Sequence, residues 1–467
     1  MPMTTLQKEK QNIESTINPA TGKKIADHEV IAEEAALEAV SEMHKAFLDW
    51  KLLPATRRAS HIAKLAEIIR AKKTELSELM SLEMGKTLNE GLQEIDLCAG
   101  ICEYTAEHGP DFLQDEQRQL DSGRALITYQ PTGIILGIQP WNFPLYQAIR
   151  YTVPNLVAGN AVILKHAENV WGTGDFIEKM VLEAGVPKNV FRHLKMSHQT
   201  SSTLIAHELV RGVTFTGSSS TGKEIAAEAA KSLKKTVLEL GSNDAYLVLS
   251  DADVETAVEV GVLGRINNCG QTCVAAKRFV IVKDKYEAFE SAYLEAMKKI
   301  RYGDPLDGEP DIGPMARADL RDSLHKQVRE SIEKGAVCRL GGEVPDGNGF
   351  FYPPTVLTNV EPGMPAYEEE LFGPVASLIK AKDDEDAMRI ANDSRFGLGG
   401  GIFSGNPERA IELARKRFDT GMVNINGYHL AQPNLPFGGV KDSGYGREHG
   451  GFGIREFVNV KSIMIAE

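Results

Sequence analysis

The sequence predicts an α/β protein in which a mostly parallel sheet is covered by helices on both faces. From Leu126 onward, short apolar runs alternate with segments of helical spacing, and this alternation is typical of βαβ units. Before that point, Ala32–Trp50 and Ala55–Met84 carry apolar residues at helical spacing, with Glu and Lys on the other faces. We therefore expect the first third to be mostly helical. No flexible linker or repeat is visible, so the domains should share crossing chain segments.

The expected strands are short and apolar. The longest clear run, Gly133–Ile138, suits a buried strand. Runs of this kind lie at residues 125–130, 132–138, 160–165, 212–217, 235–240, 245–249 and 278–282. The second half continues the alternation, with helices expected near Tyr286–Arg301 and Asp319–Lys334 and a strand at Val375–Ile379.

Length and composition narrow the class of protein. The chain has 467 residues, 42% hydrophobic and 25% charged, which is ordinary for a globular protein, and ~150 residues per domain suggests about three domains. No apolar run approaches the ~20 residues of a membrane helix. The N-terminal MPMTTLQKEK lacks the apolar core of a secretory signal, so we expect a cytoplasmic protein without a membrane partner. With a formal charge of −13 and no basic run, nucleic acid is not an expected partner.

The cysteines favour reduced thiols. There are 5, an odd number at scattered spacings, which does not indicate a disulfide framework. Cys98 and Cys102 lie four apart, as do Cys269 and Cys273. Neither pair has a nearby His cluster to complete a zinc site of four ligands. We therefore expect no metal.

Cys273 is the first candidate for chemistry. It ends the segment Asn267–Cys273 (NNCGQTC), between a Gly-containing turn and the apolar strand Phe279–Val282. A thiol at the end of a loop can be exposed enough to react, and a cation or a helix N-terminus would lower its pKa. The alternative is a small buried hydrophobe, which most free cysteines are.

Glu239 is the second candidate. It lies between apolar neighbours in Val237–Gly241 (VLELG), at the end of an expected strand. Burial would raise its pKa towards neutrality, which suits a general base. The alternative is a Glu whose carboxylate reaches solvent or a backbone amide.

The third candidate is Asn142, in the loop Gln139–Pro144 (QPWNFP). Two prolines and Trp141 make this loop rigid, and a rigid loop can hold the Asn142 amide where an oxyanion forms. The alternative is a purely structural turn.

Two further segments suit an anionic ligand. Val213–Gly222 (VTFTGSSSTG) is an expected strand, a Gly/Ser turn and a helix start, which together present free backbone N–H groups. It is neither a P-loop nor a dinucleotide fingerprint, and neither is Gly444–Gly446. Val162–Glu168 (VILKHAE) is an expected strand ending in Lys165 and Glu168, residue types that suit ribose hydroxyls. For each of these segments, the alternative is a solvated loop.

Taken together, these motifs resemble the aldehyde dehydrogenase superfamily. In order they are PWNFP, VILK, FTGS, LELG, GQ-x-C, EE-x-FGP and PFGGVK-x-SG-x-GRE. They span nearly the whole chain, from Asn18–Gly22 to the last expected strand, and several motifs in the right order are far more specific than any one alone.

The resemblance implies a role for each matching residue. Cys273 matches the nucleophile, Glu239 the general base, and Asn142 the side-chain donor of the oxyanion hole, whose second donor is the backbone N–H of Cys273. The residues that match the NAD(P) site are Trp141, Lys165, Glu168, Gly217, Ser218, Leu240, Glu370 and Phe372.

The family fold implies three parts. A Rossmann-type NAD(P)-binding domain would use residues 1–112 and 132–241, and an α/β catalytic domain residues 242–447. A small β oligomerisation segment would combine residues 113–131 and 448–467. A homodimer or homotetramer follows from this expectation.

The chain departs from the family pattern in two places. The usual Lys-Pro-Ser is Lys165-His166-Ala167 here, and the usual Leu-Gly-Gly is Leu240-Gly241-Ser242. Whether Ser242 or Cys269 modulates the site is left open.

The substrate and the coenzyme are less well defined. The Lys-His-Ala variant with Arg150 resembles a bacterial succinate-semialdehyde dehydrogenase branch, in which Arg150 would hold the substrate carboxylate. A second arginine of some relatives falls at Asn267, and Arg265 is expected to substitute. The alternatives are a broad aliphatic aldehyde, glyceraldehyde 3-phosphate, or a catalytically retired binding protein. Because Glu168 would repel a 2′-phosphate, NAD is slightly favoured over NADP.

Overall fold

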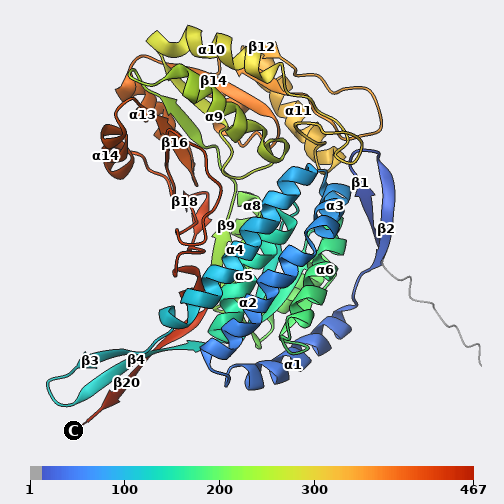
Figure 1. Cartoon of the computed structure of the whole chain (residues 1–467), viewed down its shortest axis with the longest axis vertical. Coiled ribbons are helices and arrows are strands. Elements are labelled where there is room, and N and C mark those ends of the chain that lie inside the picture. The colour runs from blue at the N-terminus through green and yellow to red at the C-terminus, as the bar shows by residue number, and fades with distance from the viewer. Residues whose placement is uncertain (1–12, 467) are drawn as a thin grey trace, which may run out of the picture.

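The computed structural model describes residues 13–466. The N-terminal segment, for which no secretory signal was expected, lies outside the described residues, as do residues 1 and 467 at the outer ends of the expected domains. The chain forms two lobes, each built on its own sheet, and a narrow arm that projects from the lower lobe (Figure 1). Among residues 13–466, no helix is both long and apolar enough to cross a bilayer.

The lower lobe contains a six-stranded sheet in the order β19-β9-β8-β5-β6-β7. Its strands are β5 (Ile134–Gln139), β6 (Ala161–His166), β7 (Phe191–His193), β8 (Val210–Thr216), β9 (Lys235–Glu239) and β19 (Gly444–Tyr445). All neighbours pair in parallel except β19, which is antiparallel to β9. The central strands are almost continuously apolar because both of their faces are covered.

Helices cover this sheet on both sides. The shared hydrophobic cores place α1 (Glu33–Trp50), α7 (His198–Ala206) and α8 (Ser219–Lys231) on one face. The other face carries α5 (Pro144–Ala158) and α6 (Trp171–Glu183). Outside these two lie α2 (Ala55–Ala71), α3 (Lys73–Met84) and α4 (Leu88–Phe112).

The upper lobe contains a seven-stranded sheet in the order β12-β13-β14-β11-β10-β16-β17. Its strands are β10 (Ala245–Val248), β11 (Arg278–Val282), β12 (Val337–Leu340), β13 (Thr355–Thr358), β14 (Val375–Ala381), β16 (Gly400–Phe403) and β17 (Asn424–Ile425). One face carries α9 (Val254–Ile266) and α10 (Lys283–Met297). The other face carries α11 (Ala318–Glu333), α12 (Pro365–Glu368), α13 (Asp384–Asn392) and α14 (Pro407–Arg417).

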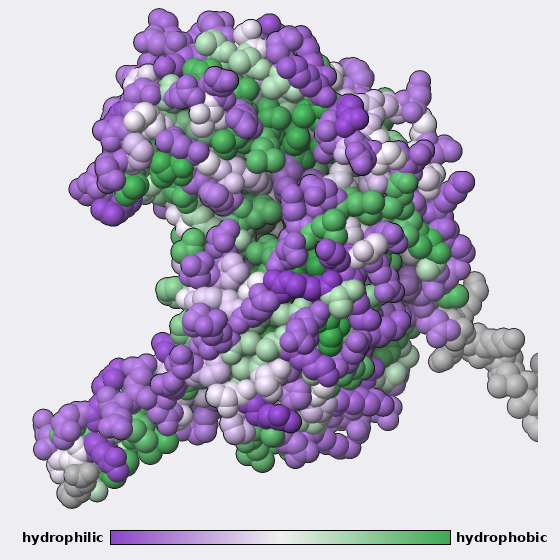
Figure 2. All heavy atoms as spheres, in the orientation of Figure 1, coloured by the Kyte–Doolittle hydropathy of each residue, from purple (hydrophilic) through white to green (hydrophobic). Residues whose placement is uncertain are grey.

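The arm is a three-stranded antiparallel sheet of β3 (Glu116–Gln119), β4 (Arg124–Pro131) and β20 (Val458–Ile465), in the order β20-β4-β3. Figure 2 shows hydrophilic and apolar atoms intermixed along it. Val460, Ile463 and Met464 are exposed. It is formed by the two segments expected to mediate oligomerisation.

The expected α/β fold is confirmed, and the structure differs from the sequence predictions in three details. The first third is mostly helical, but it begins with the hairpin of β1 (Ile13–Asn18) and β2 (Lys23–Glu29). The expected helix Ala55–Met84 is interrupted at Lys72, where the backbone leaves helical geometry at a residue that carries no helix-breaking signal. Gly444–Tyr445 pairs with β9, although it falls in the range assigned to the catalytic domain.

Candidate active site

The candidate residues meet where the two lobes face each other. Strands β5, β8 and β9 of the lower sheet end at this junction, and the loop before β11 of the upper sheet reaches it. They enclose a cavity of about 250 Å³. Its lining residues are Pro140, Trp141, Asn142, Gln147, Thr216, Gly217, Ser218, Glu239, Leu240, Gly241, Cys273, Leu320, Glu370 and Phe372. The three candidate catalytic residues are among them. We call this space the first cavity.

The loop that carries Cys273 has an unusual backbone. It follows the short helical turn η2 (Asn267–Gly270), in which Asn268 and Cys269 both have φ of 55° and Gly270 has φ of 71°. Left-handed non-glycine residues cost free energy and persist only where the surroundings hold them. Here Glu90 accepts from the Asn268 backbone N–H at 2.6 Å. From behind, Arg265 Nη2 donates to the carbonyl of Gly270 at 2.7 Å.

Two opposing effects act on the Cys273 thiol. Burial raises its pKa to about 11, while the positive charges of Arg150 and Lys277 act in the opposite direction. Glu370 and Asp244 add smaller raising effects. The site therefore combines desolvation with cations that favour the thiolate.

The Asn142 amide faces the same loop. Its Nδ2 donates to the carbonyl of Gln271 at 3.0 Å, while Asn268 Nδ2 donates to the carbonyl of Asn142 at 2.7 Å. An amide nitrogen has two protons, so one remains for an oxyanion on Cys273. At the start of the following helix, the buried Glu94 carboxylate accepts from the N–H groups of Leu145 and Tyr146, each at 2.8 Å.

His166, which replaces the family's usual proline, supports the Asn142 loop. Burial lowers its pKa to about 4, so its ring is neutral at pH 7 and has one N–H. Nδ1 accepts from the backbone N–H of Ala167 at 3.1 Å, and Nε2 donates to the carbonyl of Pro144 at 2.8 Å. This departure thus links the end of β6 to the end of the oxyanion loop.

Glu239 lies at the end of β9 with only 2% of its surface exposed. Neither carboxylate oxygen has a hydrogen-bond partner among the described residues. Burial, followed by the nearby Glu448 carboxylate, raises its pKa well above the ordinary value. An unpartnered buried carboxylate is expensive, and one that lines the same cavity as a thiol can serve as a base for water.

Arg150 lies on α5 and is completely buried. Its Nε lies 2.6 Å from Glu448 Oε2, and its Nη2 donates to Thr216 Oγ1 at 2.8 Å. The guanidinium also lies 5.2 Å from the ring centres of Tyr146 and Phe437. Its Nη1 has no hydrogen-bond partner among residues 13–466, although Arg150 itself does not line the first cavity. The contact of Arg150 with a substrate carboxylate stays a prediction.

Arg265 occupies a different position from the one expected of a substrate ligand. It is fully buried behind the Cys273 loop and does not line the first cavity. Burial lowers its pKa to about 10. Its observed contact with Gly270 gives it a part in shaping the loop, and its expected contact with substrate has no support in this geometry.

Six of the eight expected cofactor residues line the first cavity. Trp141 and Phe372 meet edge to face, with ring centres 5.9 Å apart. Ser218 caps helix α8 at the cavity wall, where its hydroxyl accepts from the N–H of Thr221 at 3.3 Å. Flat rings and a capped helix start fit a nicotinamide and a pyrophosphate.

The remaining two, Lys165 and Glu168, pair with each other outside this lining, with Lys165 Nζ 2.5 Å from Glu168 Oε1. They lie at the end of β6 and in the turn η1 (Glu168–Val170) that follows it. A lysine and a carboxylate at this edge fit ribose hydroxyls.

Sequence reasoning did not find two charged residues of the site, Lys277 and Glu448. Lys277 Nζ lies 2.9 Å from Ser242 Oγ and 3.1 Å from Glu370 Oε1. One sequence feature could have pointed to Lys277. This lysine stands beside Arg278 directly before an otherwise apolar strand, which is an unusual place for a charge. Glu448 is the last residue of the motif PFGGVK-x-SG-x-GRE, but no role was predicted for it from the sequence.

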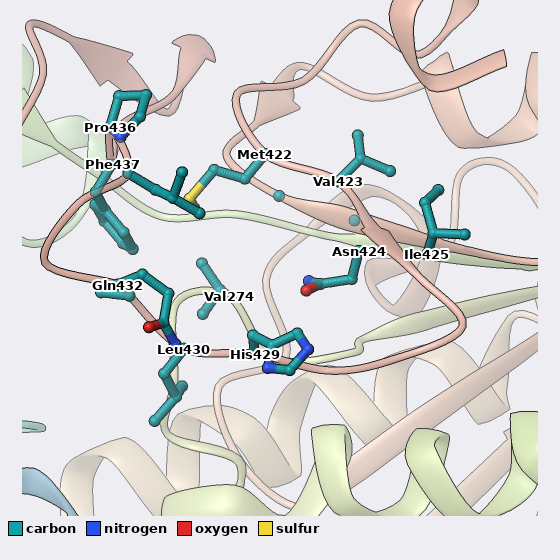
Figure 3. Close-up of a pocket in the computed structure, with 14 residues that line it drawn as sticks. Val274, Met422, Val423, Asn424, Ile425, His429, Leu430, Gln432, Pro436 and Phe437 are labelled. Atoms are coloured by element: carbon teal, nitrogen blue, oxygen red, sulfur yellow. The ribbon is translucent and has the colours of Figure 1, made fainter. Parts of the chain in front are cut away.

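A second, larger cavity of about 670 Å³ begins next to the nucleophile, at Val274 (Figure 3). Its other lining residues are Gly399, Gly400, Met422, Val423, Asn424, Ile425, His429, Leu430, Ala431, Gln432, Leu435, Pro436 and Phe437. Most belong to one irregular stretch, residues 422–437. In Figure 3, Val423, Asn424 and Ile425 lie on one side of this space, and Gln432, Pro436 and Phe437 lie on the other. Cys273 is therefore close to both cavities.

Comparisons with known proteins agree with this geometry. A family model described as "Aldehyde dehydrogenase family" matches residues 6–463. A succinate semialdehyde dehydrogenase (NAD(P)+) of Escherichia coli strain K12 is 42% identical over 448 residues, 96% of this chain and 97% of that protein. A succinate-semialdehyde dehydrogenase (NADP(+)) of Deinococcus radiodurans is 40% identical, over 96% of this chain and 94% of that protein. The crystal structure of succinic semialdehyde dehydrogenase from Streptococcus pyogenes with NADP+ superposes with a TM-score of 0.94 at 37% identity, over 97% of this chain and all of that one.

Proposed function

The chain belongs to the aldehyde dehydrogenase family, and from this premise we propose that it oxidises succinate semialdehyde to succinate with NAD(P)+ as oxidant. The observation that carries the proposal is that Cys273, Asn142 and the unpartnered Glu239 share one cavity. A covalent route divides one difficult oxidation into two easier steps.

The chain's own residues perform the following steps. The Cys273 thiolate attacks the aldehyde carbon, forming a C–S bond and an alkoxide. Asn142 Nδ2 and the backbone N–H of Cys273 donate to this oxyanion. When bound, the nicotinamide accepts the hydride that leaves this carbon, so that a thioester remains on Cys273. Glu239 then takes a proton from water, which attacks the thioester and releases the acid and the thiol.

The substrate proposal rests on the relatives' names and on Arg150. Because the net charge of −13 disfavours an anionic substrate, a local cation is needed. A guanidinium pairs well with a carboxylate, and Arg150 keeps one unpartnered donor near the thiol.

A broader specificity for aliphatic aldehydes is the second candidate. The second cavity is lined mainly by apolar side chains, including Met422, Val423, Ile425 and Leu430. Arg150 is already paired with Glu448. Both observations favour an uncharged chain in that cavity.

Steady-state rates with succinate semialdehyde and with butanal, followed by the absorbance of the reduced coenzyme, decide between the two. We expect kcat/KM for succinate semialdehyde to exceed that for butanal at least tenfold. Similar values would favour the broad specificity, and no coenzyme reduction with either aldehyde would contradict the proposal.

The coenzyme is proposed to be either NAD or NADP. The relatives' names include both, so the slight preference for NAD expected from Glu168 gains nothing from them. Lys165, at 2.5 Å from Glu168, offers a cation to a 2′-phosphate. The ratio of kcat/KM for the two coenzymes measures the preference directly.

The arm of β3, β4 and β20 is proposed to mediate a homodimer or homotetramer in the cytoplasm. Its exposed apolar residues, Val460, Ile463 and Met464, suit a partner surface. Light scattering of the intact chain tests the assembly, and a monomer would contradict it.

A further inference from the structure

Lys277 connects the nucleophile's backbone with the wall of the cofactor cavity. Its side chain is 1% exposed, and the residue directly precedes β11. Nζ donates to the carbonyl of Thr272 at 3.2 Å, to the carbonyl of Cys273 and to Ser242 Oγ. The same ammonium group lies 3.1 Å from Glu370 Oε1. One buried cation therefore contacts both sides of the reaction centre.

The contact with the Thr272 carbonyl matters because of the peptide plane. The peptide unit that contains this carbonyl also contains the N–H of Cys273, the second donor of the proposed oxyanion hole. In a planar trans peptide, the C=O and N–H point in opposite directions. A cation on the carbonyl therefore fixes the direction of the N–H and polarises it, because hydrogen bonds in series strengthen one another.

Ser242 is the second part of this arrangement. It replaces the glycine that the family usually has after Leu-Gly, and its hydroxyl donates to the carbonyl of Cys273. The same hydroxyl accepts from Lys277. Asp244 lies close to Ser242 and Lys277. Burial raises the pKa of Asp244, and the positive charge of Lys277 opposes this rise.

The contact with Glu370 reaches the cofactor wall. Its side chain is 19% exposed and lines the first cavity. A Cβ on Gly241 would lie 2.4 Å from Glu370 Oε2, so this glycine leaves the space in which the carboxylate lies. The ion pair of Lys277 and Glu370 therefore joins the backbone of the Cys273 loop to the wall of the first cavity.

We propose that Lys277 is a positioning residue that orients and polarises the Thr272–Cys273 peptide, and that its pair with Glu370 connects the cofactor wall to the thiol. The proposal rests on the proposed function for its catalytic consequence. Its effect on the thiol does not depend on which aldehyde is oxidised.

The test is the alkylation rate of Cys273 by iodoacetamide in the cofactor-free protein, at a fixed mildly alkaline pH. Below the thiol pKa, the reactive thiolate falls tenfold for each unit by which the pKa rises. A cation near a thiol lowers its pKa by about one unit or more. Lys277→Met should therefore slow alkylation roughly tenfold, and Lys277→Arg should restore most of the rate. Lys283→Met, at an exposed lysine that begins α10, is the matched control and should change nothing.

Other charged groups near the thiol remain in every variant. Arg150, Asp244 and Glu370 act on Cys273 directly, and Tyr146 and Tyr428 face it. The pH dependence of alkylation should therefore keep its shape in Lys277→Met and shift to higher pH. An alkylation rate within twofold of wild type in this variant would overturn the proposal.

Glu370→Gln tests the link while Lys277 stays in place, which matters if Lys277→Met does not fold. Removing the Glu370 carboxylate leaves the positive charge of Lys277 unopposed. The pKa of Cys273 should then fall, and alkylation should accelerate severalfold. In Lys277→Met, the same change should have a clearly smaller effect, because Glu370 then acts on the thiol only through its own charge and no longer through Lys277. Equal effects in both backgrounds would show that Glu370 acts without Lys277 and would overturn the link.

The catalytic consequence is a separate measurement. Losing one oxyanion-hole donor costs ~10²–10³ in kcat. Lys277 supports such a donor without being one itself, so Lys277→Met should lower kcat roughly tenfold. Failure of the wild type to oxidise aldehydes would contradict the proposed function and leave the alkylation test intact. An unchanged kcat together with slowed alkylation would overturn the role in the oxyanion hole.

Discussion

The two cavities near Cys273 are built in different ways. The first is formed by residues at or directly after the ends of β5, β8 and β9, and by a loop that several hydrogen bonds hold in place. The second is formed mostly by residues 422–437, which contain only the two-residue strand β17. The first cavity places charged and amide groups at fixed points, whereas the second presents mainly apolar side chains. The chemistry thus depends on a rigid region, and the choice of aldehyde is expected to depend on an irregular one.

This difference predicts two classes of variant. Changes in the first cavity should affect all aldehydes alike, because every substrate passes through the same thioester. Changes in the second should alter the relative rates of different aldehydes. Arg150 lies at the boundary, since it contacts Thr216 of the first cavity and Phe437 of the second.

Cys273→Ala should have the largest effect. Without a thiolate no thioester forms, so oxidation of succinate semialdehyde and of butanal should both disappear. Binding of NAD(P), measured by calorimetry, should persist because the cavity walls remain. Activity within tenfold of wild type on either aldehyde would refute the role of Cys273. Cys269→Ala, at a buried thiol in the same loop, is the matched control.

Glu239→Gln should slow the second half of the reaction. The hydride burst should remain, while steady-state turnover falls ~10²-fold or more, because water loses its base. The effect should be the same for both aldehydes. The absence of a burst, or unchanged turnover, would give Glu239 another role.

The pH dependence of turnover follows from the same residue. A base works deprotonated, and burial and Glu448 raise the pKa of Glu239. Deacylation should therefore be lost as pH falls through a midpoint above the ordinary carboxyl range. Glu448→Gln removes a like charge and should move this midpoint to lower pH. A midpoint near that of an exposed Glu would contradict the assignment.

The difference between the two cavities also explains which site residues could be predicted from the sequence. Asn142, Glu239 and Cys273 were identified because each lies beside a strand or a rigid loop with its own motif, and the structure brings all three to one cavity. Lys277 and Glu448 were missed because their partners, Glu370 and Arg150, are about 100 and 300 residues away in sequence. No residue of 422–435 was predicted, because an irregular segment has no periodicity to recognise.

Arg150 is expected to have an intermediate effect. A single Arg150→Met variant would leave Glu448 buried without its partner, which harms any substrate. The double variant Arg150→Met, Glu448→Gln removes both charges and should be compared with Glu448→Gln alone. Charge-assisted pairs contribute ~1.5–3 kcal/mol, so the ratio of kcat/KM for succinate semialdehyde to that for butanal should fall roughly ten- to a hundredfold. An unchanged ratio would show that Arg150 supports the site and does not hold the carboxylate.

Leu430→Ala should have the smallest effect and tests the second cavity alone. Leu430 is half-buried and lines the second cavity (Figure 3), and it packs against the same hydrophobic core as Cys273. The substitution removes apolar surface that a long aliphatic chain would cover. Burying apolar surface contributes ~25 cal/mol per Å², so the loss of binding free energy is about 1 kcal/mol for a partly covered side chain. Because 1.4 kcal/mol is tenfold, kcat/KM for hexanal should fall roughly fivefold. A four-carbon substrate held at its carboxylate depends less on this wall, so succinate semialdehyde should change less than twofold. Leu52→Ala, at an exposed leucine far from both cavities, is the control. If Leu430→Ala slowed both aldehydes equally, the second cavity would be part of the chemistry and the separation of the two regions would fail.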